Sequence, residues 1–267
     1  IFLLFLSKAY QTTIDRAILS VSQGKSNFNQ ELVNIIKELS SSGLKVVDYA
    51  SGYHRRLDTA VRMNLLDGLR QMTNEMNQEF GKEFGADGVE VDVHFFPAPD
   101  HAEVQGRQFT NEEFEKFQND EDCVDVRGKS FPAEFKGHDR RSISQYNCYH
   151  NVFPIVVGVS KPIHSDEELQ NIIDENEQGF VFEGKKYTLY EGTQLQRRLE
   201  TEIRKAKDQQ IMARQLGDGE EAKELIRESQ YKITQLTKKY NKLVELSNLP
   251  SRKDRMRVSG YRRVSTK

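Results

Sequence analysis

The stretch GVEVDVH, residues 88–94, decides the fold in the middle of this chain. Its valines alternate with polar residues, which is the two-residue period of a strand with one buried face. Pro97 and Pro99 follow closely, and proline is incompatible with the interior of a regular element. We therefore expect a strand that ends at His94 and continues into a loop or short helix over 101–106.

Helical patterns precede this strand. Apolar residues at spacings of three and four predict amphipathic helices over 29–40 and 51–84. The apolar stripe of the longer helix is expected to be core, because such stripes bury a helix. It consists of Leu57, Val61, Leu65, Leu69, Met72 and Met76. Residues 1–20 are interpreted as the end of a helix, since their apolar run is too short to span a bilayer and lacks the basic start of a signal peptide.

Shorter elements follow the strand. Residues 110–145 are polar and are interpreted as short elements on an exposed insertion, whereas 153–158 (FPIVVG) indicates a second buried strand. Ser165 with three acidic residues after it predicts a helix start. Residues 180–190 predict a β-hairpin that turns at Glu183-Gly184.

The last third of the chain is a long helical region. Its pattern runs from 194 to 247 and is broken only at 217–219 (GDG), which predicts two long antiparallel helices. Each helix carries an apolar stripe that the other can bury. The stripes are Leu195, Leu199, Ile203 and Ala206 on the first helix, and Ala222, Leu225, Ser229, Ile233, Leu236, Tyr240, Leu243 and Ser247 on the second.

These patterns predict an α+β, mainly helical protein with three domains. Residues 1–86 form an N-terminal helical region, 87–165 a small central α+β domain with short strands, and 166–267 a helix, a β-hairpin, a long antiparallel helical hairpin and a basic tail.

The apolar content of 36% and the mean hydropathy of −0.71 are low for a compact globule and favour an extended assembly component. A net charge of −2 gives no sign that the chain as a whole binds nucleic acid. Two cysteines are too few for a secreted disulfide framework and favour a reducing site of synthesis.

Two polar clusters, 94–106 (HFFPAPDHAEVQG) and 147–150 (NCYH), hold three of the six histidines and one of the two cysteines. Imidazole and thiolate are good zinc ligands, so these clusters predict a four-ligand zinc set. The set is His94, His101, Cys148 and His150. Its spacing differs from that of a zinc finger. The alternative, which involves no cofactor, is that the histidines are hydrogen-bonded at a strand end and Cys148 is a small buried apolar group.

The same residues contain the materials for catalysis. Cys148 is a potential nucleophile, with His101 or His150 as base and Asp100 or Glu103 as the group that orients the base. A nucleophile elbow, a Gly-rich phosphate loop and an HExxH motif are all missing from the sequence. We therefore assign no catalytic residue and favour a protein that is not an enzyme.

The one strongly basic stretch is 251–267, whose cations can neutralise phosphates. They are Arg252, Lys253, Arg255, Arg257, Arg262 and Arg263, with Tyr261 available for stacking on a base. A basic tail is also commonly a solvated terminus or a clamp on an acidic protein groove. Contact with packaged DNA and these two alternatives therefore stay open.

Several motifs in a fixed order resemble a known family. They are Arg62-Met63, His94 through HAEVQG (101–106), NCYH (147–150) leading into Phe153-Pro and Gly158, Tyr187-x-x-Tyr-Glu191, and QRRLETEIRK (196–205). Over most of residues 50 to 258 the chain is similar to the phage minor capsid protein family of the second type, itself distantly similar to Mu F-like head morphogenesis proteins. The sequence departs from the family pattern with Val104 in place of Trp, Ala98 in place of Arg and Ser144 in place of Cys.

The resemblance implies a structural protein of a tailed bacteriophage, made in the cytoplasm of the host bacterium and packaged inside the head. Its partners would be portal and capsid proteins, with no membrane, and portal symmetry would give multiple copies per virion. Its role would be in head assembly, genome packaging or genome delivery. Cys and His clusters in the distant relatives add weight to the four-ligand set. The alternative is a metal-dependent hydrolase or nuclease that acts during DNA injection through His101, His150 and Cys148.

Overall fold

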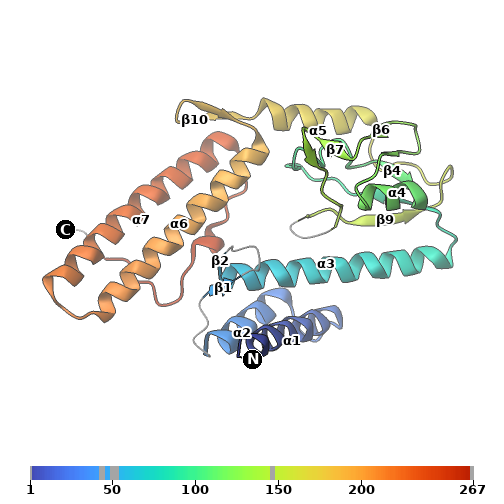
Figure 1. The fold of residues 1–267 in the computed structure, drawn as a ribbon. Helices are drawn as coiled ribbons and strands as arrows, with labels where there is room; N and C mark the ends of the chain where they lie inside the picture. The colour runs from blue at the N-terminus through green and yellow to red at the C-terminus, as the bar shows by residue number, and fades with distance from the viewer. Residues whose placement is uncertain (1, 42–45, 49–53, 145–147, 265–267) are drawn as a thin grey trace. The chain divides into compact units, whose positions relative to one another are not determined.

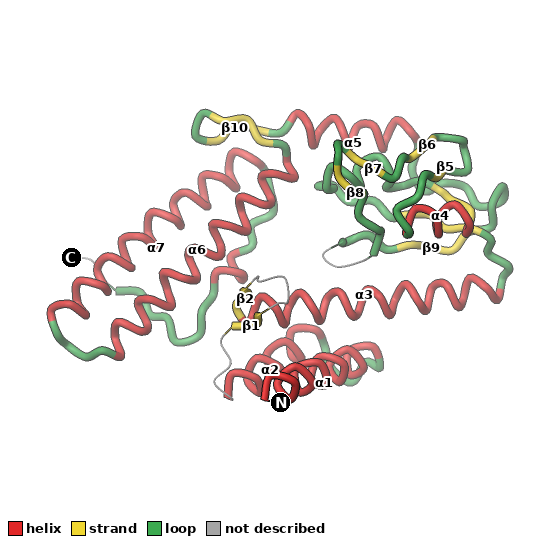
Figure 2. Tube along the Cα trace, viewed as in Figure 1, coloured by secondary structure: helices red, strands yellow, loops and turns green. Residues whose placement is uncertain are grey.

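The protein has an α+β, mainly helical fold, as the sequence predicts (Figure 1; Figure 2). The computed structural model describes residues 2–41, 46–48, 54–144 and 148–264. By their contacts, residues Ile1–His94 with Val104–His164 form one compact unit, and Phe95–Glu103 with Ser165–Lys267 form a second. The three-domain division at 86 and 165 stays a prediction.

The first unit begins with three helices that share one core. They are α1 (Phe2–Ser22), α2 (Phe28–Ser41) and α3 (Leu57–Glu83), and α3 is preceded by the antiparallel strands β1 (Val46–Asp48) and β2 (His54–Arg56). The expected start of α3 at residue 51 is wrong in part, because residues 54–56 pair as a strand, while 51–53 lie outside the described residues. Leu32 and Ile35 of α2 pack with Val61 and Leu65 of α3, so the helical periodicity of both segments is confirmed as core-forming.

The second half of α3 departs from the prediction that its whole stripe is core. Val61 and Leu65 are fully buried, but Met76, in the same stripe, is 50% exposed. Beyond Met76 the stripe continues as Phe80 and Phe84, each 57% exposed. Periodicity predicts which face of a helix is apolar, but the length of the neighbouring helices decides how much of that face is covered.

A three-stranded antiparallel sheet follows, in the order β4 (Gln108–Thr110), β3 (Gly88–Val91) and β9 (Val152–Ile155). Strand β3 therefore ends at Val91 and not at His94. The expected alternation of buried and solvated residues is also wrong at Glu90, which is 3% exposed and accepts hydrogen bonds from Gln108 Nε2 (2.7 Å) and the Ile163 N–H (3.0 Å). Helix α3 lies against β9 so closely that a Cβ added at Gly81 would come within 2.4 Å of the Pro154 Cβ.

Residues 110–144 contribute buried side chains to the core, so the expected short elements are confirmed, but their interpretation as an exposed insertion is wrong. The segment forms α4 (Asn111–Gln118) and four two-residue strands, which are β5 (Cys123–Val124), β6 (Ser130–Phe131), β7 (Glu134–Phe135) and β8 (His138–Asp139). Phe114, Phe117 and Phe131 pack around Phe109 of β4, with ring centroids 5.5–6.2 Å from it. The apolar residues are few in this segment, but they converge on one point.

The second unit contains the elements expected after Ser165. Helix α5 (Asp166–Gln178) begins with a capping box between Ser165 and Glu168, and the strands β10 (Phe180–Phe182) and β11 (Lys185–Tyr187) form a hairpin. Both turn residues, Glu183 and Gly184, have positive φ, as a tight two-residue turn requires. The second arm ends at Tyr187 and not at 190, because Thr188 and Glu191 form a second capping box that starts the next helix.

The long helical hairpin is confirmed as α6 (Leu189–Gln215) and α7 (Glu220–Ser247), which pack along their length (Figure 1). Gln196 pairs with Tyr240 (3.1 Å) and Gln210 with Gln230 (3.2 Å), so the helices run in opposite directions. Their predicted stripes are buried at Leu199, Ile203, Ala206, Ala222, Ser229, Ile233, Tyr240, Leu243 and Ser247, and Leu225 is 36% exposed. Within the described residues, no helix is long and apolar enough to cross a membrane.

Candidate functional site

The loop between β3 and β4 positions the first polar cluster. Its base is closed by two hydrogen bonds, from the Gly106 N–H to the Val91 carbonyl (2.8 Å) and from the Val91 N–H to the Arg107 carbonyl (3.0 Å). The Gln105 side chain reaches back across the loop and accepts the His94 N–H at 2.9 Å. His101 lies in the turn of this loop, where its N–H donates to the Ala98 carbonyl (2.9 Å). The loop is therefore held by its own hydrogen bonds, as expected from the prolines that keep it out of a helix or strand.

The second cluster is held by α3 and by the residue after β3. Arg70 donates to the Cys148 carbonyl and Asn74 Oδ1 accepts the Val152 N–H (3.1 Å). Asp92 accepts the N–H of Asn151 (2.8 Å) on one oxygen and its side-chain amide (3.0 Å) on the other. The backbone on both sides of His150 is thereby fixed. Asn147 lies outside the described residues.

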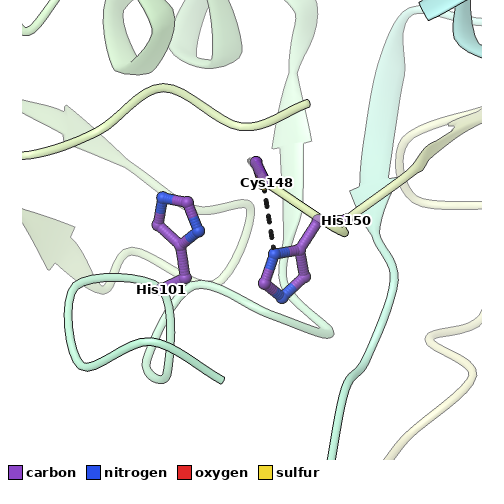
Figure 3. Close-up of side chains that lie close together, drawn as sticks. All are labelled: His101, Cys148 and His150. Carbon is purple, nitrogen blue, oxygen red and sulfur yellow. Dashed lines mark hydrogen bonds between the residues drawn. The ribbon is translucent and has the colours of Figure 1, made fainter. Parts of the chain in front are cut away.

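Three of the four predicted zinc ligands come together. One ligand atom from each of His101, Cys148 and His150 lies within 4.8 Å of the other two, and the side chains are gathered in one place (Figure 3). Cys148 Sγ is 3.5 Å from His150 Nδ1, the contact dashed in Figure 3, and His150 Nε2 is 3.4 Å from Gln105 Oε1. All three residues are almost fully buried, with exposures of 2%, 5% and 3%.

The fourth predicted ligand, His94, belongs to a different set. His94 and His150 have ring centroids 4.4 Å apart, and with Asp92 they form a second group whose ligand atoms lie within 4.8 Å of one another. Sequence reasoning missed Asp92, although its position two residues before His94 places both on one side of an extended chain. Because His150 is common to the two groups, the four predicted residues do not form a single set.

The electrostatics of the site favour neutral side chains. Burial raises the pKa of the Cys148 thiol, and hydrogen bonds from the backbone of His150 and Ser144 and the charge of Arg70 only partly oppose it. Burial likewise raises the pKa of the Asp92 carboxyl, against the opposing influence of His94 and Asn151. A nucleophilic cysteine needs a lowered pKa and access to substrate. Cys148 has neither, so the arrangement suits metal binding or hydrogen bonding better than covalent catalysis.

The predicted basic tail lies along the helical hairpin. Arg204 and Lys207 of α6 donate to the carbonyls of Arg255 (2.6 Å) and Met256 (2.7 Å) in the short helix η1 (Lys253–Met256). The side chains of Arg252, Lys253, Arg257, Arg262 and Arg263 are exposed, whereas Arg255 is half-buried. Tyr261, expected to be available for base stacking, already has Lys207 Nζ 4.8 Å from the centre of its ring. The cations of the tail are thus presented by a backbone that the hairpin holds in place.

Comparison with known protein families assigns the chain to one of them. Residues 4–245 match the family described as phage minor capsid protein 2. The chain belongs to this phage minor capsid protein family. It is therefore a bacteriophage structural protein and a component of the virion, associated with other virion proteins. No curated protein and no solved structure matches the chain.

The family match includes every residue of the two candidate metal-ligand groups and almost all of the α6–α7 hairpin. It ends at residue 245, so the basic tail lies beyond the matched region. The segment QRRLETEIRK (196–205), which lies within the matched range, falls on α6, where Gln196, Glu200 and Arg204 are buried. Gln196 donates to the Pro250 carbonyl (2.9 Å), so this segment holds the chain that leaves α7.

Proposed function

We propose that this minor capsid protein lies inside the phage head and associates with the portal, where it aids head assembly and genome packaging or delivery. The observation that carries the proposal beyond family membership is the uncovered apolar stripe on the second half of α3. Met76, Phe80 and Phe84 follow one another at four-residue spacing and are each at least half exposed. A virion protein is surrounded by other chains, and a stripe of this kind on a helix is suited to pack against one of them.

The size of the stripe supports a specific contact. A phenylalanine side chain buries about 150–250 Å² when fully covered, so covering the exposed part of Phe80 or Phe84 removes roughly 100 Å² from water. At about 25 cal/mol per Å², each ring contributes roughly 2.5 kcal/mol before the costs of association are subtracted. Aromatic anchors of this size commonly dominate an interface.

The experiment compares binding to the portal protein of the same phage. Phe80→Ala with Phe84→Ala removes both rings and keeps a good helix former, so we expect at least a tenfold weaker affinity and less of the protein in assembled heads. Val159→Ala with Ile163→Ala is the matched control, because these apolar residues of the same unit are 76% and 68% exposed but lie outside α3. Equal binding of both double variants would contradict a docking role for the stripe, and a wild-type protein absent from purified heads would contradict the proposed function.

The hydrolase or nuclease alternative receives less support. Its nucleophile would be Cys148, whose thiol is 5% exposed and has a raised pKa. A metal-activated water would instead need an open coordination position in contact with substrate, and the imidazoles of His101 and His150 are as buried as the thiol. We therefore propose that the clusters hold the central domain together.

A further inference from the structure

We propose that Asp92, His94 and His150 bind one divalent transition-metal ion such as Zn²⁺. Two imidazoles and one carboxylate form a ligand set that zinc and related first-row ions accept. All three residues belong to the first compact unit, so the site lies within that unit alone. The inference is independent of where the protein lies in the virion, and its failure would leave the proposed head function unaffected.

Hydrogen bonds hold the two ligand-bearing segments side by side. The Asp92 N–H donates to the Asn151 carbonyl (3.0 Å), and Asn151 donates its own N–H (2.8 Å) and its side-chain amide (3.0 Å) to the two carboxylate oxygens of Asp92. Asn151 follows His150 directly, so this pairing brings the carboxylate and the second imidazole together. His94 is held as well, because its N–H donates to Gln105 Oε1 (2.9 Å). Ligands that are positioned before the ion arrives lose less freedom when it binds.

The ligand atoms lie close to the spacing of a metal site. With Zn–N and Zn–O distances of about 2.0–2.2 Å, a tetrahedral ion separates two such ligands by roughly 3.4 Å. Asp92 Oδ1 and His94 Nε2 are 3.9 Å apart, so this pair needs to close by only about 0.5 Å. All three ligand atoms lie within 4.8 Å of one another, and the two imidazole rings have centroids 4.4 Å apart. Small side-chain rotations can therefore complete the geometry.

His94 carries the observation that most directly indicates a ligand. Its Nε2 is shielded from solvent and has no hydrogen-bond partner among the residues that the structure describes. A buried polar atom without a partner is costly, and a bound ion would remove that cost. The side chains of His94 and Asp92 are 32% and 19% exposed, so an ion can reach the site from solvent.

The Asp92 carboxylate remains able to bind an ion although Asn151 contacts both of its oxygens. An ionised carboxylate has about four acceptor positions, so the bonds from Asn151 leave some of them open. Such outer hydrogen bonds are common on carboxylates that bind metals, and they fix the orientation of the ligand. Arg70, whose charge also acts on Asp92, is itself paired with Asp67 at 3.1 Å.

His150 would bind the ion through Nε2. Its Nδ1 faces Cys148 Sγ at 3.5 Å, so with Nε2 on the ion Nδ1 carries the proton and donates it to a hydrogen bond with the sulfur. Cys148 then orients the imidazole and is not itself a ligand. The fourth tetrahedral position falls to water or to Gln105 Oε1, which lies 3.4 Å from His150 Nε2, the separation expected between two ligands.

The test uses the full chain without a histidine tag. Metal-free protein is titrated with Zn²⁺ by calorimetry, and the zinc retained after gel filtration is measured by mass spectrometry. We expect about one ion per chain. Co²⁺ is then bound in place of zinc, because cobalt absorbs visible light and gives a charge-transfer band when a thiolate binds it. With nitrogen and oxygen ligands alone, we expect the cobalt spectrum without this thiolate band.

Four variants test the ligand set. His94→Ala and Asp92→Asn should each weaken zinc binding more than tenfold, since loss of an outer-shell partner alone costs about 10–100-fold. Zinc should raise the melting temperature of the wild type and leave that of His94→Ala unchanged. Cys148→Ser should keep the affinity and the cobalt spectrum. His164→Ala, which alters a half-buried histidine of the same unit outside the set, is the matched control and should bind as the wild type does.

The proposal is overturned if the wild-type protein retains neither zinc nor cobalt above trace level, or if bound cobalt shows a thiolate band. Neither outcome needs a variant, so a misfolded variant does not protect the proposal. It is also overturned if His94→Ala binds zinc as tightly as the wild type, or if His164→Ala weakens binding as much as His94→Ala does. The last result would show that zinc binds exposed histidines without a defined site.

Discussion

Arg140→Met tests whether the central domain is held by the network that the structure shows around this guanidinium. Arg140 is 3% exposed and donates to four carbonyl oxygens, those of Phe117 (3.2 Å), Glu121 (3.1 Å), Phe131 (3.1 Å) and Pro132 (2.6 Å). Phe117 is in the last turn of α4, so the cation satisfies a helix end as well as joining three other points of the chain. The guanidinium also lies over the Phe117 ring, 3.8 Å from its centre.

Methionine has a similar reach but no donors. Each buried carbonyl left without a partner costs about 1–3 kcal/mol, although shared losses do not add fully and methionine keeps the contact with the ring. We expect a loss of about 3–5 kcal/mol in the free energy of unfolding of this domain, as for other broken buried charge networks. This is a large part of the roughly 5–15 kcal/mol that stabilises a domain.

The assay is hydrogen exchange followed by mass spectrometry across a guanidinium chloride series, read on peptides from 107–144. A local readout is needed because the two units need not unfold together. Lys82→Met is the matched control, since Lys82 is 70% exposed and its i,i+3 pair with Glu79 is worth at most about 0.5 kcal/mol. If Arg140→Met unfolds within about 1 kcal/mol of wild type, the network does not hold the core and the reasoning is refuted.

Two further predictions concern the second unit. Burial raises the pKa of the Glu200 carboxyl above 4.5, so the folded state binds this proton more tightly than the unfolded state and stability falls as the pH rises from 4.5 toward the folded pKa. Glu200→Gln should remove this loss, so its stability relative to wild type should increase over that range in thermal melts, and a difference independent of pH would contradict the assignment. For the tail, we expect wild-type DNA binding to weaken steeply with salt, with the logarithm of the binding constant falling by about 0.9 per phosphate contacted for each tenfold rise in salt concentration. Changing the exposed tail cations to Gln should abolish this binding; they are Arg252, Lys253, Arg257, Arg262 and Arg263. Lys223→Gln with Arg227→Gln, which alters exposed cations of α7, is the control, and a flat salt response of the wild type would exclude phosphate contact.

Local signals in the sequence predict much of the second unit. Ser165 with Glu168 marks a helix start, the stretch 217–219 marks the turn of the helical hairpin, and Glu183-Gly184 marks a β-turn, because each is decided by residues a few positions apart. Thr188 with Glu191 carries the same capping signal as Ser165, and with it the start of α6 could have been placed correctly.

The errors lie where distant residues decide the outcome. Glu90 has the polar position of an alternating strand, yet Gln108 and Ile163 satisfy its carboxylate and allow its burial. Phe114, Phe117 and Phe131 are scattered among polar residues, yet they pack into one core in which Arg140 joins the backbone at Phe117 and Phe131. Neither contact can be predicted from local sequence patterns, because each joins residues that lie far apart in the chain.

The residues of the candidate site were also predicted only in part. Residue chemistry selects His101, Cys148 and His150, which the structure brings together from segments 45 and more residues apart. The same chemistry also selects His94, and only the course of the loop after Val91 separates it from the thiol-containing set. Asp92 and Gln105 were not selected, because a single carboxylate or amide near a strand end is common and its partners are not visible in the sequence.

The central proposal is that this family member lies at the portal inside the phage head. The direct measurement is an electron cryomicroscopy reconstruction of assembled heads computed without imposed icosahedral symmetry, from wild-type phage and from a mutant that lacks this protein. We expect difference density with paired long helices on the inner side of the portal vertex, and its loss in heads that carry Phe80→Ala with Phe84→Ala. Difference density spread over the whole shell, or none at the portal vertex, would contradict it.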